Sequence, residues 1–276
     1  MFPIRDTIPA KNPSIATWLL IFANSVIFLL ELTLPQPALL RFFHLFGIVP
    51  ARYTHPDWAA WADFPLGDYR PFLTSMFLHG GWLHVIGNMW TLWIFGDNVE
   101  DRMGPARFTI FYLLCGLVAG VVHVLTNPNA TVPTVGASGA IAGVMGAYLV
   151  LFPYSRVIVL FPVLFFPFFF ELPAVTYLGF WALSQVYTGT LSLGQAGDVG
   201  GIAWWAHVGG FAVGVVLILL FIRRGSAYRL PSRGGWQRAP VLDHLNRHSS
   251  VRLISGHQPA QSMRMRVSND SWVSTI

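Results

Sequence analysis

The chain is short of charged residues and of cysteine. Only 11% of its 276 residues are charged, whereas a soluble domain carries about a quarter. The single cysteine, Cys115, lies in an apolar run, so no intrachain disulfide can form and cysteine pairing does not indicate the compartment. Because 54% of the residues are hydrophobic and the mean hydropathy is +0.55, the composition predicts a protein whose solvent is a lipid bilayer.

The basic residues are unevenly distributed. The net charge is +5, yet nine of the 17 Lys and Arg residues lie between Arg223 and Arg266. Basic residues beside the last apolar run are typical of a cytoplasmic segment near anionic lipid, so we expect no nucleic-acid partner. Residues 225–276 hold few large apolar side chains, and we predict that they form a flexible basic tail.

Long apolar runs predict an all-α polytopic membrane protein with a bundle of six transmembrane helices. A helix needs about 20 mostly apolar residues to cross a bilayer. The predicted spans are Ala16–Leu34, Trp82–Phe95, Phe108–Leu125, Ser138–Phe152, Ala174–Thr190 and Ile202–Ile222. Residues 35–81 are rich in aromatic residues, which predicts a structured outer loop at the membrane interface.

The apolar run 157–170 is ambiguous because Pro162 and Pro167 interrupt it. It is compatible with a re-entrant or interfacial stretch, with an early start of the fifth span, or with a seventh span.

Positive charge in the short loops predicts the orientation. Arg102 and Arg107 lie between spans two and three, and Arg156 follows span four. The loops 126–135 and 191–201 have no basic residue. The positive-inside rule therefore places both termini, residues 1–15 and 225–276, in the cytoplasm.

Four reactive side chains gather near the outer ends of spans two, four and six in this topology. His84 and Asn88 are four residues apart and share a helical face. Ser138 opens span four, and His207 lies about five residues into span six. Polar groups within a membrane are costly, so such a cluster indicates a functional site.

The sequence around Ser138, Gly136-Ala137-Ser138-Gly139, is typical of a loop that turns into a helix. The first N–H groups of a helix have no internal acceptor and carry the positive end of the dipole, so they can stabilise a negatively charged oxygen. His207 is a candidate base for Ser138. Small residues on both helices allow a close approach, namely Gly139, Ala142, Gly143, Gly146, Gly209, Gly210 and Gly214.

Each feature alone also has an ordinary structural interpretation. Glycine beside serine is common where membrane helices touch. A buried histidine is more often a hydrogen-bonded core residue, and Asn88 alone would more often join two helices. A haem or metal protein would use His79, His84, His123 and His207, but no His-Glu-x-x-His motif occurs and we expect neither cofactor nor metal. Only the combination favours a nucleophile with its base.

Several motifs together resemble the rhomboid intramembrane proteases. They are Tyr69-Arg70, Thr74–His84, Asn88, Phe95-Gly96, Glu100–Gly104, Gly136–Gly139 and Ala206–Gly210. The resemblance extends from about Ala16 to Arg224, and it implies a protease domain over residues 16–224.

The resemblance also implies roles for particular residues. Ser138 and His207 would form a Ser–His dyad without a third, acidic member. His84, Asn88 and the backbone N–H groups of Ser138 and Ala137 would support the oxyanion. Arg70 and Glu100 would be structural.

The family further implies cleavage of single-span membrane proteins near the outer end of their spans, and we expect a multi-pass protein of the bacterial plasma membrane. One residue departs from the pattern, because Ala142 stands where many bacterial members have an aromatic residue stacked on the histidine. That departure leaves an alternative open, a rhomboid-like protein that binds membrane clients without cutting them.

Overall fold

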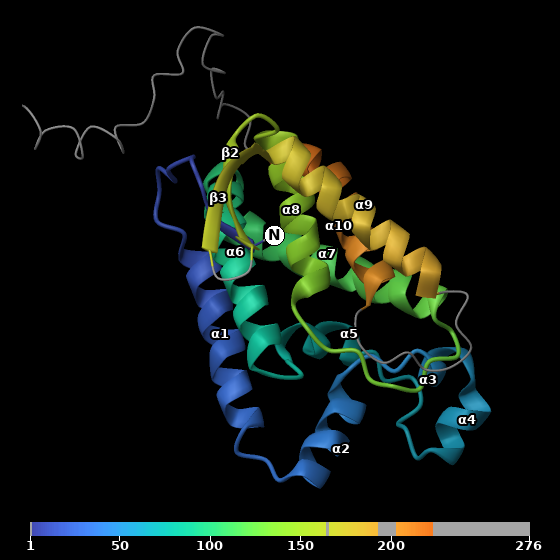
Figure 1. Ribbon diagram of the computed structural model, residues 1–276. Coiled ribbons are helices and arrows are strands. Elements are labelled where there is room, and N and C mark those ends of the chain that lie inside the picture. Colours follow the sequence, from blue (N-terminus) through green and yellow to red (C-terminus); the bar gives the residue numbers. More distant parts are fainter. Residues whose placement is uncertain (1, 164–165, 193–202, 223–276) are drawn as a thin grey trace, which may run out of the picture. The chain divides into compact units, whose positions relative to one another are not determined.

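The computed structural model describes residues 2–163, 166–192 and 203–222, which are mostly helical (Figure 1). The predicted tail 225–276 lies outside the described residues. The long helices are α1 (Ile15–Glu31), α6 (Trp82–Met103), α7 (Pro105–Thr126), α8 (Ser138–Leu151), α9 (Ala174–Ser192) and α10 (Trp204–Phe221). Their bounds lie close to those of the predicted spans, except that α6 continues past Phe95 to Met103.

Two of these helices, α7 and α10, are each long and apolar enough to cross a membrane. Helices α1 and α8 are apolar but shorter. The number of membrane spans therefore stays a prediction.

Helix α8 lies at the centre of the bundle. All of its residues from Gly139 to Tyr148 are buried, and it packs against α6, α7, α9 and α10. Figure 1 shows α8 between α6 and α10. A helix that is apolar around its whole circumference is buried in this way. The residue that opens α8, Ser138, is consequently held by the most enclosed of the described helices.

Glycines bring α8 and α10 into backbone contact. A Cβ atom added to Gly210 would lie 2.0 Å from the carbonyl oxygen of Gly139, and one added to Gly214 would lie 2.0 Å from that of Gly143. These distances are shorter than any non-bonded carbon–oxygen contact, so only glycine fits at either position. The predicted close approach of the two helices is confirmed.

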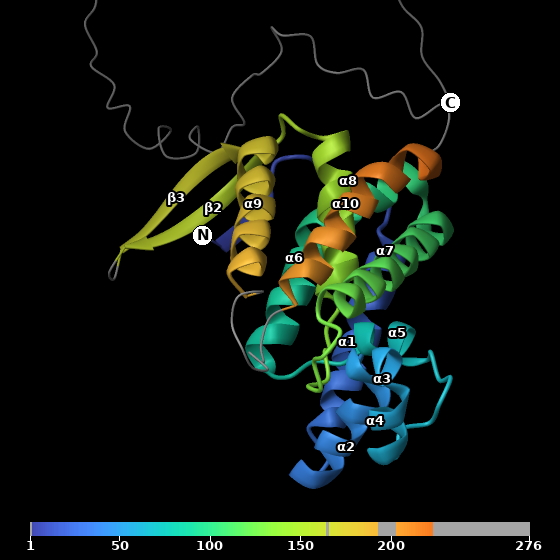
Figure 2. The ribbon, with the colours of Figure 1, turned by 90° about the vertical axis from the view of Figure 1, so that its right-hand side faces the viewer.

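The connection between α1 and α6 is a compact set of short helices, in agreement with the structured loop predicted for residues 35–81, and its position at the membrane interface stays a prediction. They are α2 (Gln36–Phe46), α3 (Ala51–Thr54), α4 (Pro56–Trp61), α5 (Pro71–Thr74) and the 3-10 turn η1 (Ser75–Phe77). Both ribbon views place α2 to α5 together at one end of the bundle (Figures 1 and 2).

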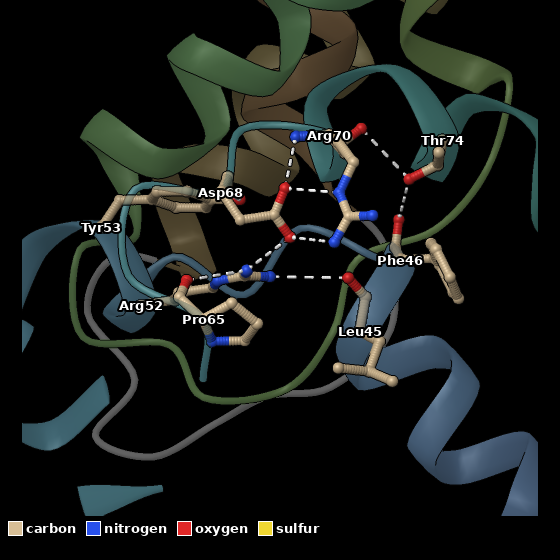
Figure 3. Close-up of polar contacts among 8 residues, drawn as sticks. All are labelled: Leu45, Phe46, Arg52, Tyr53, Pro65, Asp68, Arg70 and Thr74. Atoms are coloured by element: carbon tan, nitrogen blue, oxygen red, sulfur yellow. Dashed lines mark hydrogen bonds and ion pairs between the residues drawn. The ribbon is translucent and has the colours of Figure 1, made fainter. Parts of the chain in front are cut away.

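An acidic residue between two arginines holds this connection in shape (Figure 3). Asp68 accepts hydrogen bonds from Arg52 at 2.8 Å and from the Nε of Arg70 at 2.8 Å. The bond from Arg70 is the main reason that the pKa of Asp68 lies well below its usual range. Nearby, the Thr74 hydroxyl donates to the Phe46 carbonyl at 2.7 Å, which joins α5 to α2. The structural role implied for Arg70 fits these contacts.

Buried carboxylates fasten both ends of α1. Glu100 of α6 accepts hydrogen bonds from the backbone N–H of Ala16 and Thr17 and from the Thr17 hydroxyl, at 2.8–2.9 Å. These N–H groups belong to the first turn of α1 and have no acceptor within the helix. At the other end, Glu31 accepts the backbone N–H of His79 at 3.2 Å. Both acidic residues are thus structural in this fold.

A three-stranded antiparallel sheet is the main departure from the all-α prediction. Strands β2 (Arg156–Val163) and β3 (Phe166–Pro173) form a hairpin, and β1 (Phe2–Asp6) pairs with β2. The run 157–170 is therefore neither a seventh span nor the start of the fifth. Its β-branched residues suit a strand, while Pro162 and Pro167, which face each other across the hairpin, would break a helix.

Asp6 attaches β1 to the helical bundle. Its Oδ2 atom accepts hydrogen bonds from Tyr148 Oη at 2.5 Å and from Asn98 Nδ2 at 2.9 Å. The Trp90 indole N–H also donates to the Pro3 carbonyl at 2.7 Å. Burial, with a smaller contribution from the negative charge of Asp97, raises the pKa of Asp6 to about 7. The strand is therefore docked through a carboxyl group that titrates near neutral pH.

We expect this raised pKa to make the docking of β1 depend on pH. Between about pH 4 and pH 7 the folded state holds a proton that the unfolded chain has lost, so the free energy of unfolding falls as the pH rises through this range. Asp6→Asn should flatten this dependence. The measurement is thermal unfolding in detergent at pH 5 and pH 8 for both proteins. Equal pH dependence in the two would contradict the assignment.

Candidate active site

Ser138 is the first residue of α8, and its position depends on the loop before it. Ala137 is the N-cap of α8, is fully buried and gives no side-chain cap, so the first N–H groups of the helix remain available. Gly136 has a φ of +132° and donates its N–H to the Ser75 carbonyl at 2.9 Å. Two backbone hydrogen bonds between Thr134 and Ile48 hold the loop further upstream.

His207 lies one turn inside α10 and faces Ser138. Its Nε2 atom is 2.8 Å from the Ser138 Oγ, which is hydrogen-bond distance. The two residues come from helices whose backbones touch at Gly139 and Gly210, so the packing of α8 on α10 sets this distance. The structure brings together the two residues that the sequence singled out as nucleophile and base.

The second nitrogen of His207 has a partner that the sequence analysis missed. Its Nδ1 atom lies 2.8 Å from the Oε1 of Gln185, a buried residue of α9. The indole ring of Trp181, one turn earlier, lies against the imidazole with ring centroids 5.9 Å apart and planes tilted by 32°. The signal in the sequence that could have identified Gln185 is its polar side chain within an apolar helix, because a polar group in a membrane needs a hydrogen-bond partner.

His84 and Asn88, on the first turns of α6, point at the loop before Ser138. A Cβ atom added to Gly136 would lie 2.6 Å from the Nε2 of His84 and 3.6 Å from the Nδ2 of Asn88. Asn88 is buried, and its Nδ2 has no hydrogen-bond partner among the residues that the structure describes. A buried donor without an acceptor is costly, so this atom is suited to receive a negatively charged oxygen.

These side chains share one cavity. It has a volume of about 430 Å³, and its lining includes His84, Asn88, Ser138 and His207. The rest of the lining is mostly glycine, alanine and aliphatic side chains from α6, α7, α8 and α10 and from η1 and the loops between these helices. The cavity thus holds a hydroxyl, an imidazole within hydrogen-bond reach of it and an amide donor in apolar surroundings, where electrostatic interactions are stronger than in water.

The two other histidines of the metal alternative are His123, which also lines the cavity, and His79. His123 of α7 is buried and shares a hydrogen bond of 2.7 Å with the Thr134 hydroxyl. His79 is buried beside His84, with ring centroids 5.1 Å apart, and burial lowers its pKa to about 4. Within the described ranges, no three His, Cys, Asp or Glu residues are grouped as metal ligands.

The chain matches a known family over most of its described length. A family model described as a rhomboid domain matches residues 66–224. The chain therefore belongs to the rhomboid family, whose members are integral membrane proteins and include intramembrane serine proteases.

Individual relatives agree with this assignment. The chain is similar to Rhomboid-like protein 11, chloroplastic, of Arabidopsis thaliana, with 29% identity over 74% of this chain and 68% of that one. It is 29% identical to Rhomboid protein 1, mitochondrial, of Saccharomyces cerevisiae, over 59% of this chain and 45% of that one. It is 37% identical to Rhomboid protease GluP of Bacillus subtilis, over 30% of this chain and 16% of that one.

The chain thus spans less than half of the length of the last two relatives. Two of the three names specify an organelle. The comparisons therefore support a membrane protein but give no support to the predicted bacterial plasma membrane.

Proposed function

We propose that this protein is a serine endopeptidase that cuts single-span membrane proteins with Ser138 as nucleophile and His207 as base. The observation that carries the proposal is the 2.8 Å contact between Ser138 Oγ and His207 Nε2. A nucleophile within hydrogen-bond reach of its base, inside a cavity, is the arrangement that acyl transfer requires. Membership of a family that includes proteases supports the same reaction.

The chemistry follows from these positions. Ser138 Oγ attacks the carbonyl carbon of the scissile bond while His207 Nε2 takes its proton. The carbonyl oxygen becomes negative, and the N–H groups at the start of α8 together with Asn88 and His84 donate to it. The C–N bond then breaks as His207 protonates the leaving amine. Water, activated by the same histidine, hydrolyses the resulting ester and releases the second product.

The substrate must unwind before it can react. A peptide bond within a helix is shielded by its own turn, so a short extended segment has to enter the cavity. Single-span proteins with small residues near one membrane surface satisfy this requirement best. Incubation of the purified protein with a model single-span substrate, with and without a fluorophosphonate that labels active serines, tests the proposal. Substrate binding without cleavage or labelling would favour the client-binding alternative.

We expect Asn88→Ala and His84→Ala to slow cleavage more than they slow covalent labelling of Ser138. Loss of one donor to an oxyanion commonly costs about 10²–10³-fold in turnover, and backbone donors that remain would soften the loss. The base that activates Ser138 is intact in both variants. The measurement is a time course of fluorophosphonate labelling beside substrate cleavage.

Asn24→Ala is the matched control for this experiment. Asn24 is also a buried asparagine, but it lies in α1 and its Nδ2 donates to the Leu20 carbonyl. Its replacement should leave both rates unchanged. Cleavage by Asn88→Ala at the wild-type rate would return Asn88 to a packing role.

We propose that both termini face the cytoplasm, on the charge asymmetry of the loops. The loop between α7 and α8 would then be outside, and the turn between α8 and β2 would be inside. Single cysteines at the exposed positions Asn129 and Tyr154, in a Cys115→Ala background, report this. An impermeant maleimide added to intact cells should label the first and spare the second. The reverse pattern would invert the topology.

A further inference from the structure

A chain of hydrogen bonds along α9 ends on His207. Ser184 Oγ donates to the Trp181 carbonyl at 2.6 Å, and Gln185 Nε2 donates to Ser184 Oγ at 3.1 Å. The serine hydroxyl has one proton, which it gives to the carbonyl, so it can only accept from Gln185. The amide nitrogen of Gln185 is thereby assigned to Ser184. Its oxygen, Oε1, is left facing the Nδ1 of His207.

This order of donors fixes the tautomer of His207. Oε1 of Gln185 is an acceptor, so an unprotonated Nδ1 at 2.8 Å would set two lone pairs against each other. The proton of the neutral imidazole therefore sits on Nδ1. Nε2 then presents its lone pair to Ser138 Oγ, which is the form that a general base needs.

Trp181 adds a second constraint on the same ring. Its indole lies beside the imidazole. Ala142, by contrast, is fully buried in α8. It stands at the position where, by the resemblance described above, many bacterial members carry the aromatic residue that stacks on the histidine. The tilted aromatic contact on His207 thus comes from α9 in this chain, while Trp204 of α10 meets the same ring edge-on with centroids 6.4 Å apart. The missing aromatic side chain at position 142 no longer counts against a functional base.

We propose that Gln185 and Trp181 are positioning residues that hold His207 in its proton-accepting form, so that the site works as a Ser138–His207–Gln185 triad with a neutral third member. The inference rests on the proposed protease function. An amide suits the location, because it orients the imidazole and accepts from Nδ1 without the cost of a carboxylate buried in a membrane. When His207 becomes an imidazolium, its bond to Oε1 gains strength as a charge-assisted hydrogen bond.

Two substitutions at position 185 distinguish a role of Gln185 in orienting His207 from a role in packing alone. Gln185→Met keeps the volume but removes the acceptor, and we expect kcat to fall about tenfold, the ordinary contribution of one hydrogen bond, with KM within about twofold of wild type. Gln185→Glu keeps the acceptor and adds a negative charge, which raises the pKa of a neighbouring imidazole. In the Gln185→Glu variant, the acidic limb of the kcat–pH profile should therefore shift to higher pH by about one unit.

Thr190→Val is the matched control on the same helix. Its exposed hydroxyl donates to the Val186 carbonyl, one turn back along α9. This variant should keep the wild-type kcat and pH profile. For the aromatic contact, Trp181→Phe should retain activity within about threefold, and Trp181→Leu should lose about as much as Gln185→Met.

A wild-type kcat in Gln185→Met, or a kcat–pH profile of Gln185→Glu that superimposes on that of wild type, would overturn the inference. If Gln185→Met does not fold, the profile of Gln185→Glu decides alone. Cleavage by Ser138→Ala would instead refute the protease function itself. Loss of cleavage in Ser138→Ala with an unaffected Gln185→Met would leave that function standing and refute only the triad.

Discussion

Ser138→Ala and His207→Ala are each expected to lower the rate of substrate cleavage by about 10⁴-fold or more while the protein stays folded. The two side chains meet at 2.8 Å and act on the same proton, so either loss stops the same step. For this reason the double variant should be no slower than the worse single variant. The measurement is single-turnover cleavage of a model substrate, beside thermal unfolding in detergent as the check on folding.

Both substitutions are mild for the fold. Ser138 and His207 line the cavity and are only partly buried, so truncation creates little new void. Effects that simply add would mean that the residues act in separate steps. Measurable cleavage by a folded Ser138→Ala protein would remove Ser138 as the nucleophile.

Gly214→Ala is expected to damage both stability and activity, although it adds a single methyl group. That group would lie 2.0 Å from the carbonyl oxygen of Gly143 and 2.6 Å from its Cα, and backbone atoms cannot rotate away as a side chain can. Forcing the helices apart should lower the free energy of unfolding by about 1–3 kcal/mol. A shift of 1 Å between Ser138 and His207 can cost about 10²-fold in rate.

Gly179→Ala provides the matched control. A Cβ atom at Gly179, on α9, would meet no atom within 4 Å. Both substitutions gain the same helix propensity, about 1 kcal/mol, so the difference between the two proteins isolates the contact between α8 and α10. Equal unfolding temperatures and cleavage rates for the two variants would show that this contact is not limiting.

The sequence predicted the helices well because their signal is local. An apolar run such as 105–126 is long enough to identify by itself. The starts of α6, α8 and α9 at Trp82, Ser138 and Ala174 coincide with the predicted starts. By contrast, the C-terminal end of α6 was not predicted. It carries Glu100, which is buried because it accepts hydrogen bonds from α1, and no local sequence pattern indicates such a distant partner.

The sheet was missed for a related reason. The run 157–170 has too many prolines for a helix, but nothing near it indicates that residues 2–6 are its partner. Pairing between distant segments is a property of the fold and not of a sequence window. The N-terminal segment, which was predicted only as a cytoplasmic end, is the element that completes the sheet.

The site was predictable in part. Ser138, His207, His84 and Asn88 were all chosen from polar residues at helix starts, and all four line one cavity. Gln185 was not chosen because its role depends on the rotation of α9 about its own axis, which the sequence of that helix does not determine. The aromatic contact from Trp181 was missed for the same reason.

The pairing of β1 with β2 has a consequence for how the protein is made. Strand β1 leaves the ribosome before β2, and its partners Val157 to Leu160 are translated more than 150 residues later. At about 5–20 residues per second this is a delay of roughly 8–30 s. Throughout that interval the helices that precede β2 can enter the bilayer, while β1 has no strand to pair with. Assembly of the sheet is therefore a late event that follows the synthesis of α6 and α8.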